Sequence, residues 1–171
     1  MSNPVAEHES YAPKHLGWAV LTVSTSRTLA DDKAGDRLAA LLAAAGHERI
    51  ERRLVADDAA AITLAVNELL ETTGIDVIVV AGGTGVSPSD VTPDAVLPLL
   101  DRQLEGFGEI FRSLSFEQVG AAALLSRAVA GTSHGRAIFV LPGSPAAVEL
   151  GLSRLILPVA AHLIGQLRRV R

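Results

Sequence analysis

The chain has 171 residues, of which 49% are hydrophobic but only 4% aromatic, a composition that favours one α/β domain with a core of Ala, Val, Leu and Ile. Its 15 basic and 19 acidic residues give a net charge of −4 without a basic cluster, which argues against nucleic-acid binding. Because cysteine is absent, disulfides, thiolate metal sites and cysteine nucleophiles are excluded, and a reducing compartment is indicated.

The two ends of the chain show no targeting or membrane segment. Residues 1–15 have no apolar stretch of the kind found in export signals and are predicted to be a disordered arm. Residues 16–171 are expected to form a single domain. The apolar run at 155–165 is too short for a bilayer span and is interrupted by Pro158 and His162. We therefore expect a soluble cytoplasmic protein with no membrane partner.

The first half of the domain alternates strands and helices. Apolar, β-branched runs predict the strands, and apolar residues spaced by three and four predict the helices. The predicted elements are a strand at 17–24, a helix at 32–46, a more exposed strand at 49–55, a helix at 57–74 and a strand at 75–81. Asp32 marks the start of the first helix, and either Asp57 or Asp58 can cap the second. Right-handed crossovers convert this order into a largely parallel sheet with helices on both faces.

The second half contains a hairpin between helical segments. Thr92 is predicted as an N-cap with Pro93 at the first helical position. One or two short helices are expected in the glycine-interrupted region 105–122. Two strands around 133–135 predict a hairpin that adds an antiparallel element near the sheet edge. A helix after Ser144 and a closing apolar helix complete the chain.

A glycine loop follows the strand at 75–81 and is the first candidate site. It opens with four residues that carry small side chains or none: Gly82, Gly83, Thr84 and Gly85. Such a backbone can approach an anion closely, and the helix that starts at Thr92 also favours negative charge. Asp90 alone would repel a phosphate bound by this loop. A Mg²⁺ ion between the carboxylate and the phosphates of a nucleotide would remove that repulsion. The simpler alternative is a tight turn in which Asp90 is an ordinary polar residue.

The loop matches neither common nucleotide motif, because it lacks the Lys-Ser/Thr ending of a Walker loop and has Pro88 in place of a third glycine. A second cradle of phosphate size is predicted where another strand ends, at Pro142, Gly143 and Ser144. Ser24 offers a hydroxyl at a third strand end. Each of these three strand ends, taken alone, can be explained as a turn or a helix cap. A ligand site is favoured because the ends of parallel strands meet at one edge of the sheet.

Asp57 brings a second carboxylate to the same edge, although N-capping is its simpler role. The five histidines have no ligand spacing and are assigned to neither metal binding nor catalysis.

Three segments, AGGTGVSPSDVTPDAV, EGFGEIFRSLSFEQVGAAALLSRAVAG and VLPGSPAAVELGL, together resemble the MoaB/Mog family of molybdenum cofactor biosynthesis proteins. The resemblance extends over nearly the whole chain from Gly17 onward. It implies the molybdopterin-binding fold, a three-layer α/β/α sandwich with a mostly parallel central sheet and an antiparallel edge element, assembled into homotrimers or homohexamers. It further implies adenylation of molybdopterin by Mg²⁺-ATP with release of pyrophosphate. A metal-inserting protein is a further candidate partner.

By this resemblance, Asp57 and Asp90 are the metal-binding and catalytic acids, while the glycine loop and the Ser144 turn belong to the nucleotide and pterin sites. Two positions depart from the family pattern: many members have an acid at Thr25 and a basic residue at Ser89. A non-catalytic molybdopterin-binding or scaffolding member therefore remains the alternative to the adenylyltransferase. A flavodoxin-like binder of another phosphorylated ligand fits the fold but not the motifs.

Overall fold

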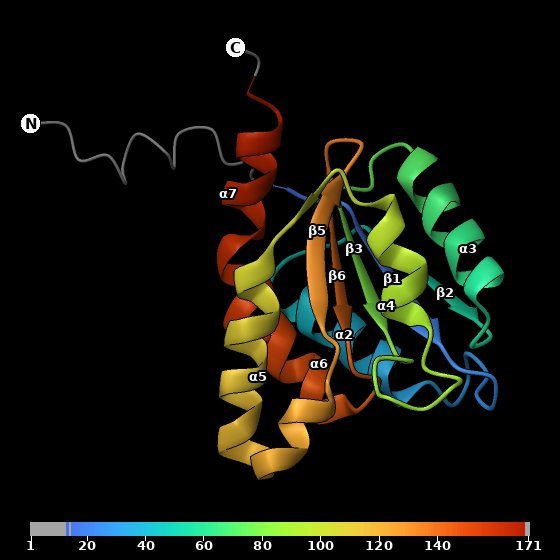
Figure 1. Cartoon of the computed structure of the whole chain (residues 1–171). Helices are drawn as coiled ribbons and strands as arrows, with labels where there is room; N and C mark the ends of the chain where they lie inside the picture. The colour runs from blue at the N-terminus through green and yellow to red at the C-terminus, as the bar shows by residue number, and fades with distance from the viewer. Residues whose placement is uncertain (1–12, 14, 170–171) are drawn as a thin grey trace, which may run out of the picture.

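A six-stranded sheet forms the centre of the structure, a computed structural model that describes residues 13 and 15–169. Most of the arm predicted at 1–15 lies outside the described residues. The strand order is β2-β1-β3-β6-β5-β4, and helices cover both faces (Figure 1). The strands are β1 (Trp18–Val23), β2 (Ile50–Val55), β3 (Val77–Ala81), β4 (Arg102–Gln103), β5 (Val129–Ser133) and β6 (Arg136–Leu141). The α-helices are α2 (Lys33–Ala44), α3 (Ala59–Glu71), α4 (Thr92–Val96), α5 (Glu105–Val119), α6 (Pro145–Gly151) and α7 (Leu157–Leu167).

The sheet separates two cores. Helices α2, α5, α6 and α7 pack on one face, and α3 and α4 pack on the other (Figure 1). Side chains of successive strand residues point to opposite faces, so Val79 joins the first core and Val80 the second. Strands β2, β1, β3 and β6 are parallel, and β5 and β4 add an antiparallel edge. The predicted three-layer α/β/α sandwich is therefore confirmed.

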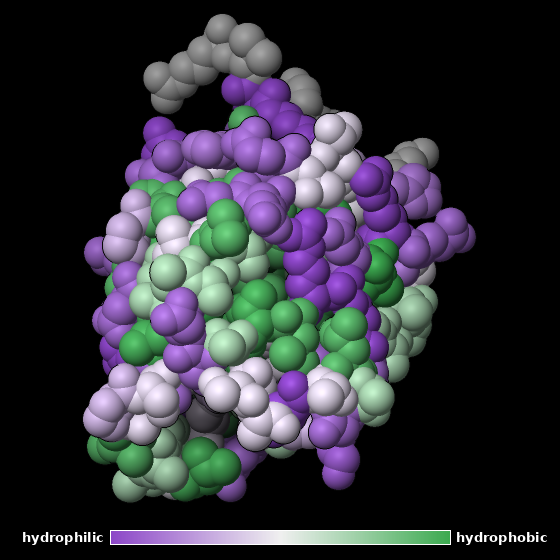
Figure 2. Space-filling view, turned by 90° about the vertical axis from the view of Figure 1, so that its right-hand side faces the viewer, coloured by the Kyte–Doolittle hydropathy of each residue, from purple (hydrophilic) through white to green (hydrophobic). Residues whose placement is uncertain are grey.

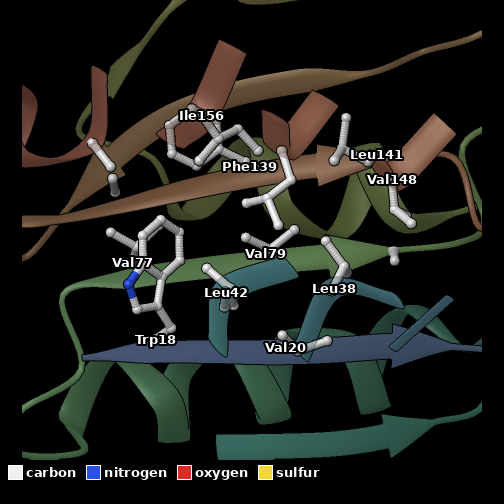
Figure 3. Packing of buried hydrophobic residues seen from close by; sticks show 14 of the residues in the cluster. Trp18, Val20, Leu38, Leu42, Val77, Val79, Phe139, Leu141, Val148 and Ile156 are labelled. Atoms are coloured by element: carbon white, nitrogen blue, oxygen red, sulfur yellow. The ribbon is translucent and has the colours of Figure 1, made fainter. Parts of the chain in front are cut away.

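The larger core is built around the parallel strands, as predicted from their apolar runs. Figure 3 shows Val20 of β1, Val79 of β3 and Phe139 of β6 along adjacent strands, with Leu38 and Leu42 of α2 packed over them. All five side chains are at most 1% exposed. Strand β2 is only half-buried because it lies at the sheet edge, where charged residues discourage pairing with another chain. This confirms the prediction of a more exposed second strand.

The hairpin between β5 and β6 is also as predicted. His134 and Gly135 connect the two strands with φ angles of 49° and 73°. Two consecutive residues in the left-handed region match the twist of the flanking strands, and glycine adopts this conformation readily.

Two predictions about the helices in the middle of the chain are wrong. Val91 precedes α4, so Thr92 is not the N-cap but the first helical residue, and Pro93 is the second. The region 105–122 forms one 15-residue helix that continues as the 3₁₀ segment η2 (Gly120–Leu125), because its first glycines lie in the opening turn. A Cβ at Gly108 would lie 2.6 Å from the Ala128 carbonyl oxygen, so this glycine allows α5 to approach β5.

The two helices predicted after Ser144 form one continuous helix, which Pro158 does not interrupt. The helix runs without a break from 145 to 167 through a π-helical turn, η3 (Leu152–Ile156), which ends two residues before this proline. Proline cannot donate the usual backbone hydrogen bond, and a local change of the hydrogen-bond pattern from α to π lets the helix continue past it. By length and composition the helix could cross a membrane, but a buried stripe faces the sheet, consisting of Val148, Leu152, Ile156, Ala160 and Ile164. The core helix of a globular domain has this pattern.

Asp32 is the charged side chain most deeply buried in the described part of the chain, with an exposed fraction of 1%. Its carboxylate accepts hydrogen bonds from the Thr22 hydroxyl at 2.6 Å and from the Gly35 backbone N–H at 2.9 Å. Arg52 of β2 lies 3.2 Å from the same carboxylate. One side chain thus caps α2 and ties it to two adjacent strands.

We predict that Asp32→Ala lowers the free energy of unfolding by about 3 kcal/mol, because it removes a helix cap and leaves buried donors unpaired. Asp36→Ala is the matched control, since Asp36 pairs with the same Arg52 at 2.6 Å but is 57% exposed. Asp36→Ala should lower the free energy of unfolding by less than about 1 kcal/mol. Denaturant unfolding measures both values, and equal losses would contradict the importance assigned to Asp32.

Candidate functional site

Three strand ends meet at the carboxyl edge of the sheet, as their parallel order predicts. The Gly82 N–H donates to the Leu141 carbonyl oxygen at 3.0 Å, linking the end of β3 to the end of β6. Gly82 has a φ of 121°, and a Cβ there would lie 2.2 Å from the carbonyl oxygen of Val23, the last residue of β1. Only glycine fits between the two neighbouring strands at this point.

Asp57 is not a helix cap, because Asp58 performs that role by accepting from the Ala61 N–H at 2.8 Å. Instead, Asp57 Oδ2 accepts from the Thr25 N–H at 2.6 Å and from the Thr25 hydroxyl at 2.9 Å. The other oxygen, Oδ1, has no hydrogen bond among the described residues and would lie 3.5 Å from a Cβ at Gly83. Asp57 is thus hydrogen-bonded to the loop after β1 through one oxygen, and its other oxygen lies near the glycine loop.

Asp90 folds back over the glycine loop. Its Oδ2 accepts from the Ser87 N–H at 2.9 Å, while its own N–H donates to the Ser87 carbonyl oxygen at 2.9 Å. A Cβ at Gly85 would lie 2.7 Å from Oδ2, so this glycine makes room for the carboxylate. Asp90 therefore has a structural role in its turn, and one of its oxygens accepts no hydrogen bond within the described segments.

Arg127 holds this loop in place, and the sequence reasoning did not single it out. Its Nε donates to the Gly85 carbonyl oxygen at 2.8 Å, and its Nη2 donates to the Asp90 carbonyl oxygen. Its Nη1 lies 2.9 Å from Asp94 Oδ2, and its backbone N–H donates to the Thr84 carbonyl oxygen at 2.8 Å. No local pattern could have identified this role, because Arg127 lies 42 residues from Gly85 in the sequence.

A cavity of about 360 Å³ opens beside the glycine loop and the Ser144 turn. This volume is within the range of pockets that bind small molecules. Its apolar wall includes Phe111, Leu125, Ala147 and Leu150. Seven of the predicted site residues also line it: Gly83, Thr84, Gly85, Asp90, Pro142, Gly143 and Ser144.

The other predicted site residues do not line the cavity: Ser24, Asp57, Gly82 and Thr92. Ser24 Oγ lies 3.5 Å from Ser26 Oγ at the end of β1. Thr92 is fully buried, and its hydroxyl has no hydrogen-bond partner among the described residues. A Cβ at Gly83 would lie 2.4 Å from that hydroxyl, which places Thr92 directly behind the glycine loop.

The donor set restricts what kind of metal could bind. Within residues 13 and 15–169, no group of three His, Asp or Glu side chains could hold an ion. Mg²⁺ is often held by one or two carboxylates together with substrate phosphates and waters. Asp57 and Asp90 therefore fit a Mg²⁺ ion that arrives with a phosphate ligand, but not a metal site made of protein groups alone.

We predict that Arg127→Leu loosens the glycine loop, because it removes the side-chain donors to Gly85 and Asp90. The free energy of unfolding should fall by about 1 kcal/mol, because two half-buried carbonyl acceptors lose their donors. Hydrogen exchange at the Ser87 and Asp90 N–H groups should accelerate. Asp94→Asn is the control, since it removes the ion pair but leaves both carbonyl contacts, and unchanged exchange in Arg127→Leu would contradict the prediction.

Residues 19–162 match the family model described as a probable molybdopterin binding domain. Molybdenum cofactor biosynthesis protein B of Bacillus cereus is 42% identical, with 96% of this chain and 98% of that protein covered. The protein of the same name from Staphylococcus aureus is 49% identical, over 88% of this chain and 91% of that protein.

Solved structures show the same likeness. A crystal structure of molybdenum cofactor biosynthesis protein B superposes with a TM-score of 0.89 at 41% identity and covers 93% of this chain and 99% of its own. The tungsten cofactor synthesizing protein MoaB from Pyrococcus furiosus gives a TM-score of 0.80 at 35% identity, over 92% of this chain and 100% of its own.

Proposed function

This chain belongs to the MoaB/Mog family of molybdenum cofactor biosynthesis proteins, and from that membership we propose that it is a molybdopterin adenylyltransferase. An oxygen of the molybdopterin phosphate attacks the α-phosphorus of ATP, the bond to the β-phosphate oxygen breaks, and pyrophosphate leaves. The product is adenylated molybdopterin. This role in cofactor biosynthesis suits a cytoplasmic protein, and a metal-inserting protein is the proposed recipient of the product.

The placement of Asp57 and Asp90 beside one glycine loop is the observation that carries the proposal. Each carboxylate keeps one oxygen without a hydrogen bond among the described residues, and the absence of a side chain at Gly85 leaves room for Asp90. These acids would hold Mg²⁺, which neutralises phosphate charge when bound. The glycine backbone positions the nucleotide, so the protein contributes position and charge rather than a covalent nucleophile.

We propose that the Pro142–Ser144 turn binds the phosphate of the pterin. A monophosphate and a triphosphate cannot share one cradle, and the structure offers two adjacent turns on one cavity. The second turn contains no acid and leads into the 23-residue helix 145–167, whose N-terminus favours an anion. Ser144 caps this helix by accepting from the Ala147 N–H at 3.2 Å, and its own hydroxyl hydrogen can be donated to a phosphate.

Molybdopterin binding without adenylation is the second candidate function, and two contacts favour it. Thr25 occupies one oxygen of Asp57 with two hydrogen bonds. Ser89, at the position where many relatives are basic, lies with its hydroxyl 3.1 Å from that of Ser87 and supplies no charge. Incubation of the protein with molybdopterin, Mg²⁺ and ATP distinguishes the two candidates, because only the enzyme yields adenylated pterin and pyrophosphate.

We predict that Asp90→Asn lowers the adenylation rate by at least about 100-fold, because it removes a charge required at the phosphates. The melting temperature should stay nearly constant, since an amide oxygen can still accept from Ser87. Asp58→Asn is the matched control: it removes an acid from the same edge but preserves an N-cap, so activity should persist. Unchanged turnover in Asp90→Asn would refute the metal assignment, and a sharp loss of stability would favour a purely structural turn residue.

The oligomer is proposed to be a homotrimer or homohexamer. Large exposed apolar side chains gather on α5 and η2, with exposed fractions from 52% to 77%: Ile110, Phe116, Val119, Leu124 and Leu125. The C-terminal helix exposes one large apolar side chain in the described range, Val159. Figure 2 shows the opposite side of the molecule, which carries α3, where apolar residues in the middle are bordered by hydrophilic ones.

We predict that light scattering at micromolar concentration gives the mass of a trimer or hexamer, and that Leu124→Lys reduces it to that of one chain. A buried lysine without a partner would destabilise the interface. Leu64→Lys on α3 is the control, because Leu64 is 61% exposed and lies outside the α5–η2 surface. A monomeric wild-type protein would exclude the proposed assembly.

A further inference from the structure

A site for phosphates needs positive charge, and three basic residues belong to the loops and helix starts at the carboxyl edge of the sheet: Arg27, Lys33 and Arg127. Arg127 is committed to Asp94 and to the glycine-loop carbonyls. Lys33 is exposed at the first position of α2 and contacts neither turn. Arg27 is therefore the remaining cation with a contact to one of the two turns.

The guanidinium of Arg27 makes one hydrogen bond and no ion pair with the described residues. The side chain is half-buried, and its Nη1 donates to the Gly143 carbonyl oxygen at 3.3 Å. No carboxylate of the described chain lies within ion-pair distance of it. Asp31, the nearby acid in the same loop, is instead bound by the N–H and the hydroxyl of Thr28. A guanidinium has five donors, and toward the described residues Arg27 uses one of them, in a long bond to an uncharged acceptor.

The contact places this charge beside the cavity. Gly143 lines the cavity, and a Cβ on it would lie 3.1 Å from the Cα of Gly82, so the second turn is packed tightly against the glycine loop. Arg27 does not line the cavity itself, but its guanidinium contacts the backbone of a residue that does. Arg27 is in the loop that also contains Thr25, the partner of Asp57, so that loop touches both halves of the site.

We propose that Arg27 binds the phosphate group held by the Pro142–Ser144 turn and supplies positive charge at that turn. A guanidinium can bind two phosphate oxygens at once, and such charge-assisted bonds are stronger than its present bond to a carbonyl. The identification of that phosphate as the pterin monophosphate rests on the proposed function. The phosphate contact itself rests on the position and the free donors of Arg27.

Three variants test the proposal by titration calorimetry: Arg27→Gln, Arg27→Lys and the matched control Lys33→Gln, which removes an equal charge from the same edge. Arg27→Gln should weaken molybdopterin binding about 10- to 100-fold, the usual range for losing a hydrogen bond to a charged group. Arg27→Lys should recover part of the affinity, while Lys33→Gln should change it less than about twofold. Mg²⁺-ATP should bind all variants with wild-type affinity, and each should keep its melting temperature.

Equal molybdopterin affinity in Arg27→Gln and Lys33→Gln would overturn the proposal, as would a selective loss of ATP binding in Arg27→Gln. A second probe separates this result from failure of the proposed function. If wild-type protein does not bind molybdopterin, inorganic phosphate is titrated while the amide shifts of residues 143–147 are followed. Saturation in wild type, with at least about tenfold weaker binding in Arg27→Gln, would support the contact. No saturation in wild type, or no difference between the proteins, would overturn it.

Discussion

The close approach of three strand ends at Gly82 is the constraint on which the site depends. Its N–H is bound to the end of β6, and its Cα lies against the carbonyl oxygen that ends β1. A side chain at this position would push the strands apart. Because the strands cannot separate, the glycine loop and the Pro142–Ser144 turn must leave the sheet side by side and border one cavity.

Charge is divided between these two turns in a way that suits two different anions. Asp57 and Asp90 both lie beside the glycine loop, whereas the second turn has no acid and touches Arg27. A phosphate at the first turn requires a cation to accompany it, while a phosphate at the second can bind protein groups directly. Arg127 contributes little free charge to either, because Asp94 neutralises it, and so its effect is on the shape of the loop.

Elements with a strong local signal were predictable from sequence. Strands β1 and β3 are buried on both faces and therefore read as continuous apolar runs, and the left-handed hairpin turn requires a residue such as Gly135. The two-residue strand β4 was missed because it is too short to carry a pattern. Thr92 was misplaced by one position because it resembles a cap, although its hydroxyl is turned into the interior behind Gly83.

Site residues were predictable only where the chain itself places them at a strand end. Which of Asp57 and Asp58 caps α3 depends on Thr25, a residue of another loop. Thr25 donates two hydrogen bonds to Asp57, and Asp58 caps the helix. Arg127 and Arg27 act through contacts with residues 42 and 116 positions away. Such pairings are set by the packing of the whole sheet, and no spacing along the chain encodes them.

The π turn before Pro158 has a consequence for the orientation of the last helix. Buried residues of the 145–167 helix recur every fourth position from Val148 to Ile164, whereas an ideal α-helix turns once in 3.6 residues. A regular helix would therefore rotate this stripe steadily away from the sheet. The wider turn at Leu152–Ile156 holds an extra residue and absorbs much of that rotation. The turn therefore lets Ser144 line the cavity at one end while α7 packs on the sheet at the other, and removing one residue from it would rotate one end relative to the other by about 100°.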